Sequence, residues 1–78
     1  MKTVKISLNS IDKVKSFVNA ISQFDYDFDL ISGRYVIDAK SIMGIFSLDL
    51  SKSIDLAIHA EEELDKILEV IHPYLVES

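Results

Sequence analysis

The sequence predicts a small α+β domain in which a four-stranded antiparallel sheet carries three helices on one face. Three observations predict it: runs that alternate apolar and polar residues, runs with apolar residues at helical spacing, and the order of these runs. That order is β-α-β-β-α-β-α. Because each strand is polar on one face, the sheet should be antiparallel and open to solvent on one side. Residues 1–78 are expected to form a single domain.

A change of period near the N-terminus predicts the first strand and the first helix. Residues 3–8 alternate between apolar and polar side chains, which is typical of a half-buried strand. Ser10 is a suitable N-cap for the helix that follows, and Asp12 in its first turn suits the helix dipole. The helix is expected to run to about residue 24. Its expected buried stripe consists of Ile11, Val14, Phe17, Val18 and Ile21.

Two β-rich runs in the middle of the chain predict a hairpin. They cover residues 26–31 and 34–39, and a Ser-Gly pair joins them. Each run alternates apolar with polar or charged side chains, so each strand should turn one face toward the core. Ser41 then stands at the start of a short helix that is expected to continue through about residue 48.

A last strand and a last helix complete the predicted domain. The strand covers residues 53–59 and places three apolar side chains on one face: Ile54, Leu56 and Ile58. The helix is expected to begin near Ala60, which puts the glutamates at 61–63 in its first turn, where the dipole favours them. Pro73 should end or kink it. Its expected buried stripe consists of Leu64, Ile67, Leu68 and Ile71.

The composition excludes several classes of protein. With 13 acidic and 8 basic residues the formal net charge is −5, which argues against binding nucleic acid or anionic membranes. The absence of cysteine removes disulfides and thiolate metal sites. No apolar run is long enough for a signal peptide or a membrane span, so we expect a cytoplasmic protein. Asp25, Asp27 and Asp29 alternate like the start of a calcium loop, but Leu30 replaces the required glycine, so no metal or other cofactor is expected.

The segment from Lys40 to Leu48 carries a resemblance to a known family. Its first five residues, Lys-Ser-Ile-Met-Gly, resemble the segment that opens the short second helix of HPr, the phosphocarrier of the bacterial sugar phosphotransferase system. The predicted element order also matches HPr, so the resemblance covers nearly the whole chain, as pattern rather than identity outside this segment. It implies the HPr-like two-layer open-faced sandwich.

The residues at the start of the first helix differ from those of the family. In HPr a histidine at this N-cap carries the phosphoryl group. When the first helices are aligned through Phe24, Ser10 stands at the position of that histidine, Asp12 at that of an arginine and Lys13 at that of a proline. A serine forms a phosphate ester that does not pass its phosphoryl group on readily, and Asp12 would repel phosphate oxygens. We therefore expect neither phosphocarrier nor enzyme activity; Ser10 can equally be an ordinary helix cap.

Ser41 keeps its full local context. The resemblance implies that it matches the regulatory serine that HPr kinase phosphorylates in many Gram-positive bacteria, where the phosphoserine enables binding to a transcriptional regulator. A phosphate there would meet free backbone amides, with Lys40 adjacent. Ile42, Met43 and Phe46 resemble the exposed patch through which HPr docks its partners. Either Ile42 or Ile45 is expected to belong to the core. Proteins of the Crh type likewise lack the histidine and keep the serine; capping alone would also explain Ser41.

Three hypotheses for function follow. The first is a non-enzymatic interaction module, controlled by phosphorylation of Ser41, whose partner is a phosphotransferase-system component, HPr kinase or a transcriptional regulator. The second is a phosphocarrier with an unorthodox acceptor, such as Ser10 or a histidine, although neither His59 nor His72 lies in a motif. The third is a structural subunit that dimerises through its open sheet face or a sheet edge.

Overall fold

Four antiparallel strands form one sheet in the order β1-β4-β2-β3. The structure is a computed structural model, and it describes residues 1–76. The strands are β1 (Lys2–Ile6), β2 (Asp27–Ser32), β3 (Tyr35–Asp38) and β4 (Ile54–His59). β4 lies inside the sheet between β1 and β2, while β1 and β3 are its two edges. The predicted four-stranded antiparallel sheet is confirmed.

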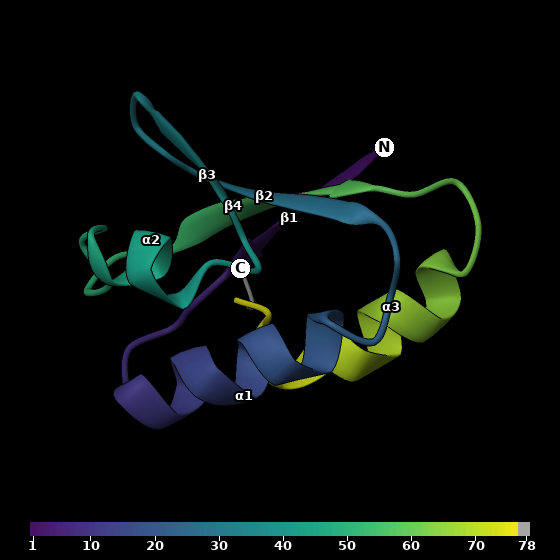
Figure 1. Ribbon diagram of the computed structural model, residues 1–78, viewed down its shortest axis with the longest axis horizontal. Coiled ribbons are helices and arrows are strands. Elements are labelled where there is room, and N and C mark those ends of the chain that lie inside the picture. The colour runs from purple at the N-terminus through teal and green to yellow at the C-terminus, as the bar shows by residue number, and fades with distance from the viewer. Residues whose placement is uncertain (77–78) are drawn as a thin grey trace.

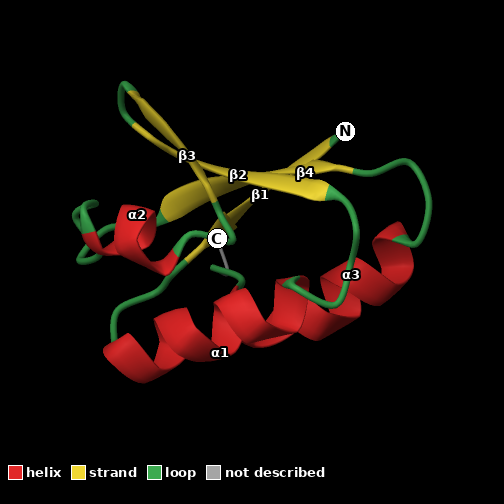
Figure 2. Cartoon of the chain, in the orientation of Figure 1, coloured by secondary structure: helices red, strands yellow, loops and turns green. Residues whose placement is uncertain are grey.

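Three α-helices accompany this sheet within residues 1–76. They are α1 (Ile11–Ile21), α2 (Ile42–Phe46) and α3 (Leu64–Ile71), and a 3-10 turn, η1 (His72–Tyr74), follows α3. α1 and α3 pack against each other on one side of the sheet, and the short α2 lies at one end of it (Figure 1). All of the helices lie on one side of the strands (Figure 2), so the predicted two-layer α+β architecture is confirmed. None of these helices is long and apolar enough to cross a membrane.

The strand register brings the apolar residues of neighbouring strands onto the same face. Val4 of β1 and Leu30 of β2 both lie opposite Leu56 of β4. Because opposite residues of an antiparallel pair point to the same face, these three side chains meet beneath the sheet. The predicted inner residues of β4 are all buried: Ile54, Leu56 and Ile58. Their burial against the helices is the main force that holds the two layers together.

α1 packs on the sheet through four of the five residues of its predicted stripe. The buried members are Val14, Phe17, Val18 and Ile21. The expectation for Ile11 was wrong, because its side chain is 62% exposed. Ile11 is the first residue of the helix, and helical side chains point back toward the N-terminus, so it extends past the packed surface. α1 ends at Ile21, before residue 24. The Ser22 hydroxyl donates to the Val18 carbonyl, and the amide of Phe24 donates to the Ile21 carbonyl only three residues back, which closes a tighter turn than that of an α-helix.

The last helix begins later than the sequence predicted. α3 starts at Leu64 rather than near Ala60, and the glutamates at 61–63 lie in the connecting loop. The prediction that these glutamates lie in the first turn of the helix is therefore wrong. The physical reason is the backbone of Glu63, which has φ +59° and is left-handed, a conformation that a right-handed helix cannot include. The C-terminal end of the helix agrees with the prediction from Pro73: α3 stops at Ile71 and is followed by η1, which contains this proline.

The C-terminal segment returns to the sheet and covers part of the outer edge of β1. The amide of Ser7 donates to the Tyr74 carbonyl at 2.8 Å, and the amide of Val76 donates to the Lys5 carbonyl at 3.0 Å. An isolated bridge joins Ile6 and Leu75 between these two bonds. The ring of Tyr74 also meets that of Phe17 edge-on, with 5.5 Å between centroids. Residues 74–76 are therefore tied both to the sheet and to α1.

Candidate functional site

The N-terminus of α1 is capped by Ser10. The hydroxyl of Ser10 accepts a hydrogen bond from the Lys13 amide at 3.1 Å, and its carbonyl accepts one from the Val14 amide, also at 3.1 Å. Its extended backbone, φ −149° and ψ 157°, is typical of an N-cap. Asp12 lies in the first turn, and both Asp12 and Ser10 are exposed. The site where the resemblance places a phosphoryl acceptor thus presents a hydroxyl beside a carboxylate.

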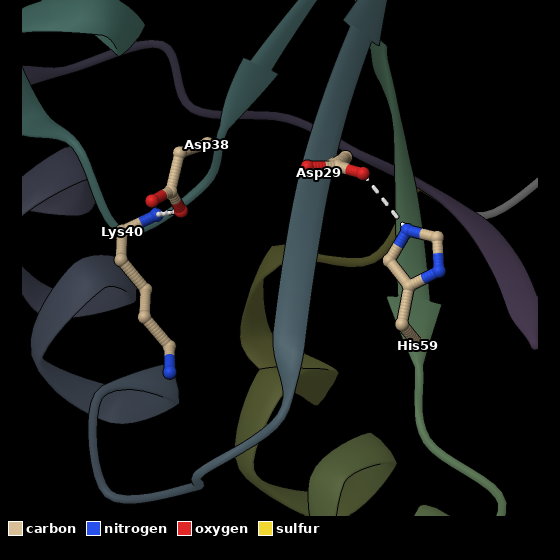
Figure 3. A network of polar contacts seen from close by, with 4 residues as sticks. All are labelled: Asp29, Asp38, Lys40 and His59. Carbon is tan, nitrogen blue, oxygen red and sulfur yellow. Dashed lines mark hydrogen bonds and ion pairs between the residues drawn. The ribbon is translucent and has the colours of Figure 1, made fainter.

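The two histidines belong to other elements. His59 ends β4, and its Nε2 lies 2.8 Å from Oδ2 of Asp29 on the neighbouring strand (Figure 3). A shallow hollow of about 370 Å³ around this pair is lined further by Asp27 and Asp38. His72 begins η1. His59 therefore lies on an acidic part of the sheet, within a cross-strand pair that sequence spacing did not indicate.

No carboxylate cluster suited to a metal ion occurs in residues 1–76. The alternating aspartates near the start of β2 do not converge on one point, because the carboxylate of Asp29 is turned toward His59 and forms a hydrogen bond with its Nε2.

The start of α2 is a second serine cap. The hydroxyl of Ser41 accepts a hydrogen bond from the Gly44 amide at 3.2 Å, and its carbonyl accepts one from Ile45 at 3.0 Å. Ser41 is half-buried. A Cβ on Gly44 would lie 3.3 Å from the Ser41 hydroxyl and 3.4 Å from Cδ1 of Ile37. Gly44 thus keeps room around the hydroxyl, a role that the sequence pattern alone did not reveal.

Lys40 does not serve Ser41 in the way the sequence suggested. Its ammonium donates to the Phe24 carbonyl at 2.7 Å and lies 5.6 Å from the centre of the Phe28 ring. Its amide donates to Oδ1 of Asp38 at 2.9 Å, while the side chain extends away from that turn (Figure 3). In this structure the ammonium is therefore engaged by the Phe24 carbonyl and the Phe28 ring and not by the Ser41 hydroxyl. The long side chain instead ties the start of α2 to the loop after α1, where a carbonyl and a ring face both attract a cation.

Three apolar side chains beside Ser41 are exposed and form what we call the α2 patch: Ile42, Met43 and Phe46. Met43 is 81% exposed, and Ile42 and Phe46 are 37% and 40% exposed. Ile45 is completely buried, so it, and not Ile42, supplies the core contact of the helix. Adjacent exposed apolar residues on so small a domain indicate a surface suited to protein contacts.

The loop after α2 is held by Asp49. Its carboxylate accepts hydrogen bonds from the Ser51 hydroxyl at 2.6 Å and from the Ser51 amide at 3.1 Å. Both bonds lower the pKa of Asp49, and the bond from the hydroxyl has the larger effect. The positive charge of Lys52 lowers this pKa further. The carboxylate thus stabilises the turn that leads from α2 back into β4.

The comparisons with known proteins agree with this architecture. Residues 13–75 match the family model PTS-HPr, described as the phosphotransferase-system HPr component phosphorylation site. The chain belongs to the PTS-HPr family. The matched span begins after Ser10 and includes Ser41 and the α2 patch. HPr proteins carry a phosphoryl group and are not catalysts themselves.

Two solved structures illustrate the relationship. HPr-C-His from Thermoanaerobacter tengcongensis is 25% identical, with a TM-score of 0.76 over 94% of this chain and 89% of that one. The phosphocarrier protein HPr from Bacillus anthracis str. Ames is 26% identical, with a TM-score of 0.69 over 96% of this chain and 94% of that one. No curated protein sequence matches the chain. The HPr-like open-faced sandwich predicted from the element order is confirmed.

Proposed function

We propose that this HPr-family domain does not relay phosphoryl groups and acts instead as a protein-interaction module that phosphorylation of Ser41 controls. The observation that carries the proposal is the hydroxyl of Ser10 at the N-cap of α1, the position to which the sequence resemblance assigns the family's histidine. HPr proteins work by contacting other proteins of the phosphotransferase system, which supports a protein as the partner.

The chemistry of the α1 cap supports the loss of the carrier step. A carrier needs an acceptor whose phosphorylated form has a high transfer potential, and an imidazole provides this where an aliphatic hydroxyl does not. The hydroxyl of Ser10 is also engaged by the Lys13 amide. Asp12 adds a negative charge in the first turn, which would oppose an incoming phosphoryl donor.

The surroundings of His59 argue against it as a substitute acceptor. Its Nε2 is paired with Asp29, and Asp27 and Asp38 line the same hollow. A phosphoryl donor is itself anionic, so three carboxylates around the imidazole would disfavour its approach. The acidic sheet face therefore favours a structural role for the histidine in joining β2 to β4.

The start of α2 has the features of a phosphorylation switch. A kinase would form a bond between the γ-phosphorus of ATP and Oγ of Ser41 as the bond to the bridging oxygen breaks, releasing ADP, with the hydroxyl proton passing to solvent. The product carries close to two negative charges beside the apolar α2 patch. A partner that combines an apolar groove with arginine side chains would then bind more tightly than it binds the unmodified domain.

A phosphotransfer assay with enzyme I and labelled phosphoenolpyruvate tests the first half of the proposal. We expect no stable label on the wild-type domain under conditions that fully label a functional HPr. The double variant Ser10→His/Asp12→Arg restores the family's acceptor and its anion partner, and should acquire acid-labile label. Label on the wild-type protein would overturn the proposed loss of carrier activity.

Treatment with HPr kinase and ATP, read by intact mass, tests the second half. Wild type should gain one phosphate and Ser41→Ala none. Ser47→Ala is the matched control, because the Ser47 hydroxyl binds the Gly44 carbonyl at the other end of the same helix. The switch is excluded if the wild-type protein stays unmodified or if Ser41→Ala is labelled as well as Ser47→Ala.

A further inference from the structure

The two edges of the sheet are protected differently. Residues 74–76 cover part of the outer edge of β1, whereas β3 pairs with β2 alone among residues 1–76. Tyr35 is 69% exposed and Val36 is 62% exposed, although successive strand residues point to opposite faces. The β2–β3 hairpin projects beyond the helical layer (Figure 1), which explains why both faces are uncovered at the first two residues of β3, whereas Ile37 is half-buried against the core. An uncovered edge with apolar side chains is a site for strand addition.

The backbone of β3 is oriented for such an addition at Val36. Ser32 lies opposite Tyr35 across the two-residue turn, and the amide of Ala39 donates to the Phe28 carbonyl at 2.8 Å. Backbone groups of alternate strand residues point to alternate sides, so Tyr35 and Ile37 direct theirs toward β2. Val36 between them therefore directs its amide and carbonyl away from β2, where they can bind a further strand.

The residues of this edge are complementary to a second copy of themselves. In an antiparallel pair centred on Val36, the two Val36 residues exchange both of their hydrogen bonds. Tyr35 of each copy then lies opposite Ile37 of the other. Arg34, the turn residue directly before β3, comes next to Asp38 at the end of the other copy's β3. Within residues 1–76 Arg34 has no ion pair, and Asp38 uses only Oδ1, in its bond to the Lys40 amide. Each copy thus offers an available cation and a carboxylate oxygen at matching positions.

We propose that two copies of this chain associate through β3, forming a symmetric antiparallel pair centred on Val36 that extends the sheet across both molecules. The charge match between Arg34 and Asp38 selects a second copy over an arbitrary strand, since it is satisfied twice in one register. The paired segment is short and buries far less than the ~1,200 Å² of a stable interface, so association should be weak and depend on concentration. This inference does not depend on the proposed function.

The interface would lie next to α2. β3 leads into that helix through the short link at residues 39–41, and a Cβ added to Gly44 would lie 3.4 Å from Cδ1 of Ile37. The second copy's Tyr35 would contact Ile37 on that same side of the sheet. Self-association would therefore border the α2 patch without using its residues.

Sedimentation velocity over a series of protein concentrations tests the proposal through a charge exchange. Wild type should show an average mass that rises with concentration toward that of a dimer. Arg34→Asp and Asp38→Arg should each remain monomeric, because each variant places like charges opposite one another in the pair. An equimolar mixture of the two variants should associate, since every substituted side chain then faces an opposite charge.

Matched charge reversals elsewhere and a folding check complete the experiment. Lys15→Asp on α1 and Glu69→Arg on α3 change exposed charges by the same amounts and should associate as the wild type does. Circular dichroism establishes that each variant is folded. A wild-type protein that stays monomeric at every concentration would overturn the proposal. A strand of another protein would then be the remaining candidate for pairing with β3. Association that both edge variants retain, or a folded mixture that fails to associate, would overturn it equally.

Discussion

α1 and α2 begin in the same way and do different things. In each a serine hydroxyl accepts a hydrogen bond from the amide three residues on, at 3.1 Å for Ser10 and 3.2 Å for Ser41. α1 then continues for 11 residues and buries four of them, whereas α2 has five residues and buries only Ile45. The cap is a local device that short-range sequence decides. Whether a capped helix supports the core or presents a surface depends on what lies against it.

The largest expected effect is at the buried face of α1. Phe17 is fully buried and packs edge-on against Tyr74, so Phe17→Ala removes core contacts of both the helix and the C-terminal segment. We expect a loss of about 3–5 kcal/mol in the free energy of unfolding. Urea unfolding measures it. A loss below about 1 kcal/mol would show that α1 is not the helix on which the core depends.

The next effect separates the two sides of α2. Ile45→Ala creates a cavity and should destabilise the domain by about 2–4 kcal/mol. Met43→Ala on the α2 patch should change stability by less than about 0.5 kcal/mol, because that side chain is already in water. The same urea series measures both variants. Equal losses would contradict the distinction between a packed and a presented side of this helix.

The two caps themselves should be similar in strength. Ser10→Ala and Ser41→Ala each remove one hydroxyl acceptor from a helix amide, at an expected cost of about 1 kcal/mol. Replacement by glycine at either position should cost only a few tenths of a kcal/mol. Thermal or urea unfolding of the four variants makes the comparison. A cost confined to Ser10 would mean that α2 contributes nothing to global stability.

The smallest effect concerns the turn after α2 and its dependence on pH. Hydrogen bonds from Ser51 lower the pKa of Asp49 below its ordinary value of 3.8, so the native state favours the carboxylate more than the unfolded chain does. The resulting stabilisation is present above pH 3.8 and is lost as the pH falls through the lowered value. The stability difference between wild type and Asp49→Asn should therefore shrink between about pH 6 and about pH 3. Urea unfolding at both pH values measures it, and an unchanged difference would show that Asp49 titrates alike in both states.

The strands were predicted better than the helix ends. The alternation of β4 placed all three of its inner residues correctly, because it lies inside the sheet and its apolar face has helices beneath it. β3 has the same kind of alternation, yet Tyr35 is mostly exposed, because this edge projects past the helices. α3 begins at Leu64, about four residues after the predicted start, because the left-handed backbone of Glu63 belongs to the loop that turns the chain under the sheet. Sequence periodicity describes an element's faces and does not say what covers them.

The candidate site shows the same division. Ser10 and Ser41 were expected as caps and make the predicted contacts, because N-capping involves residues three apart in the chain. Lys40 was expected beside Ser41, yet its ammonium binds the carbonyl of Phe24, 16 residues away. The sequence also did not indicate the pair of His59 and Asp29 or the space that Gly44 leaves around the Ser41 hydroxyl. Each of these involves atoms that only the folded chain brings together.

The order of strands and helices, the two serine caps and the acidic charge of the domain were determined by the sequence alone, since each follows from neighbouring residues or from composition. The tertiary structure decided where Lys40 places its charge, which side of α2 stays in solvent and which edge of the sheet remains unpaired. Those outcomes depend on contacts between segments far apart along the chain, and such contacts form only when burial of the shared core brings the two layers together.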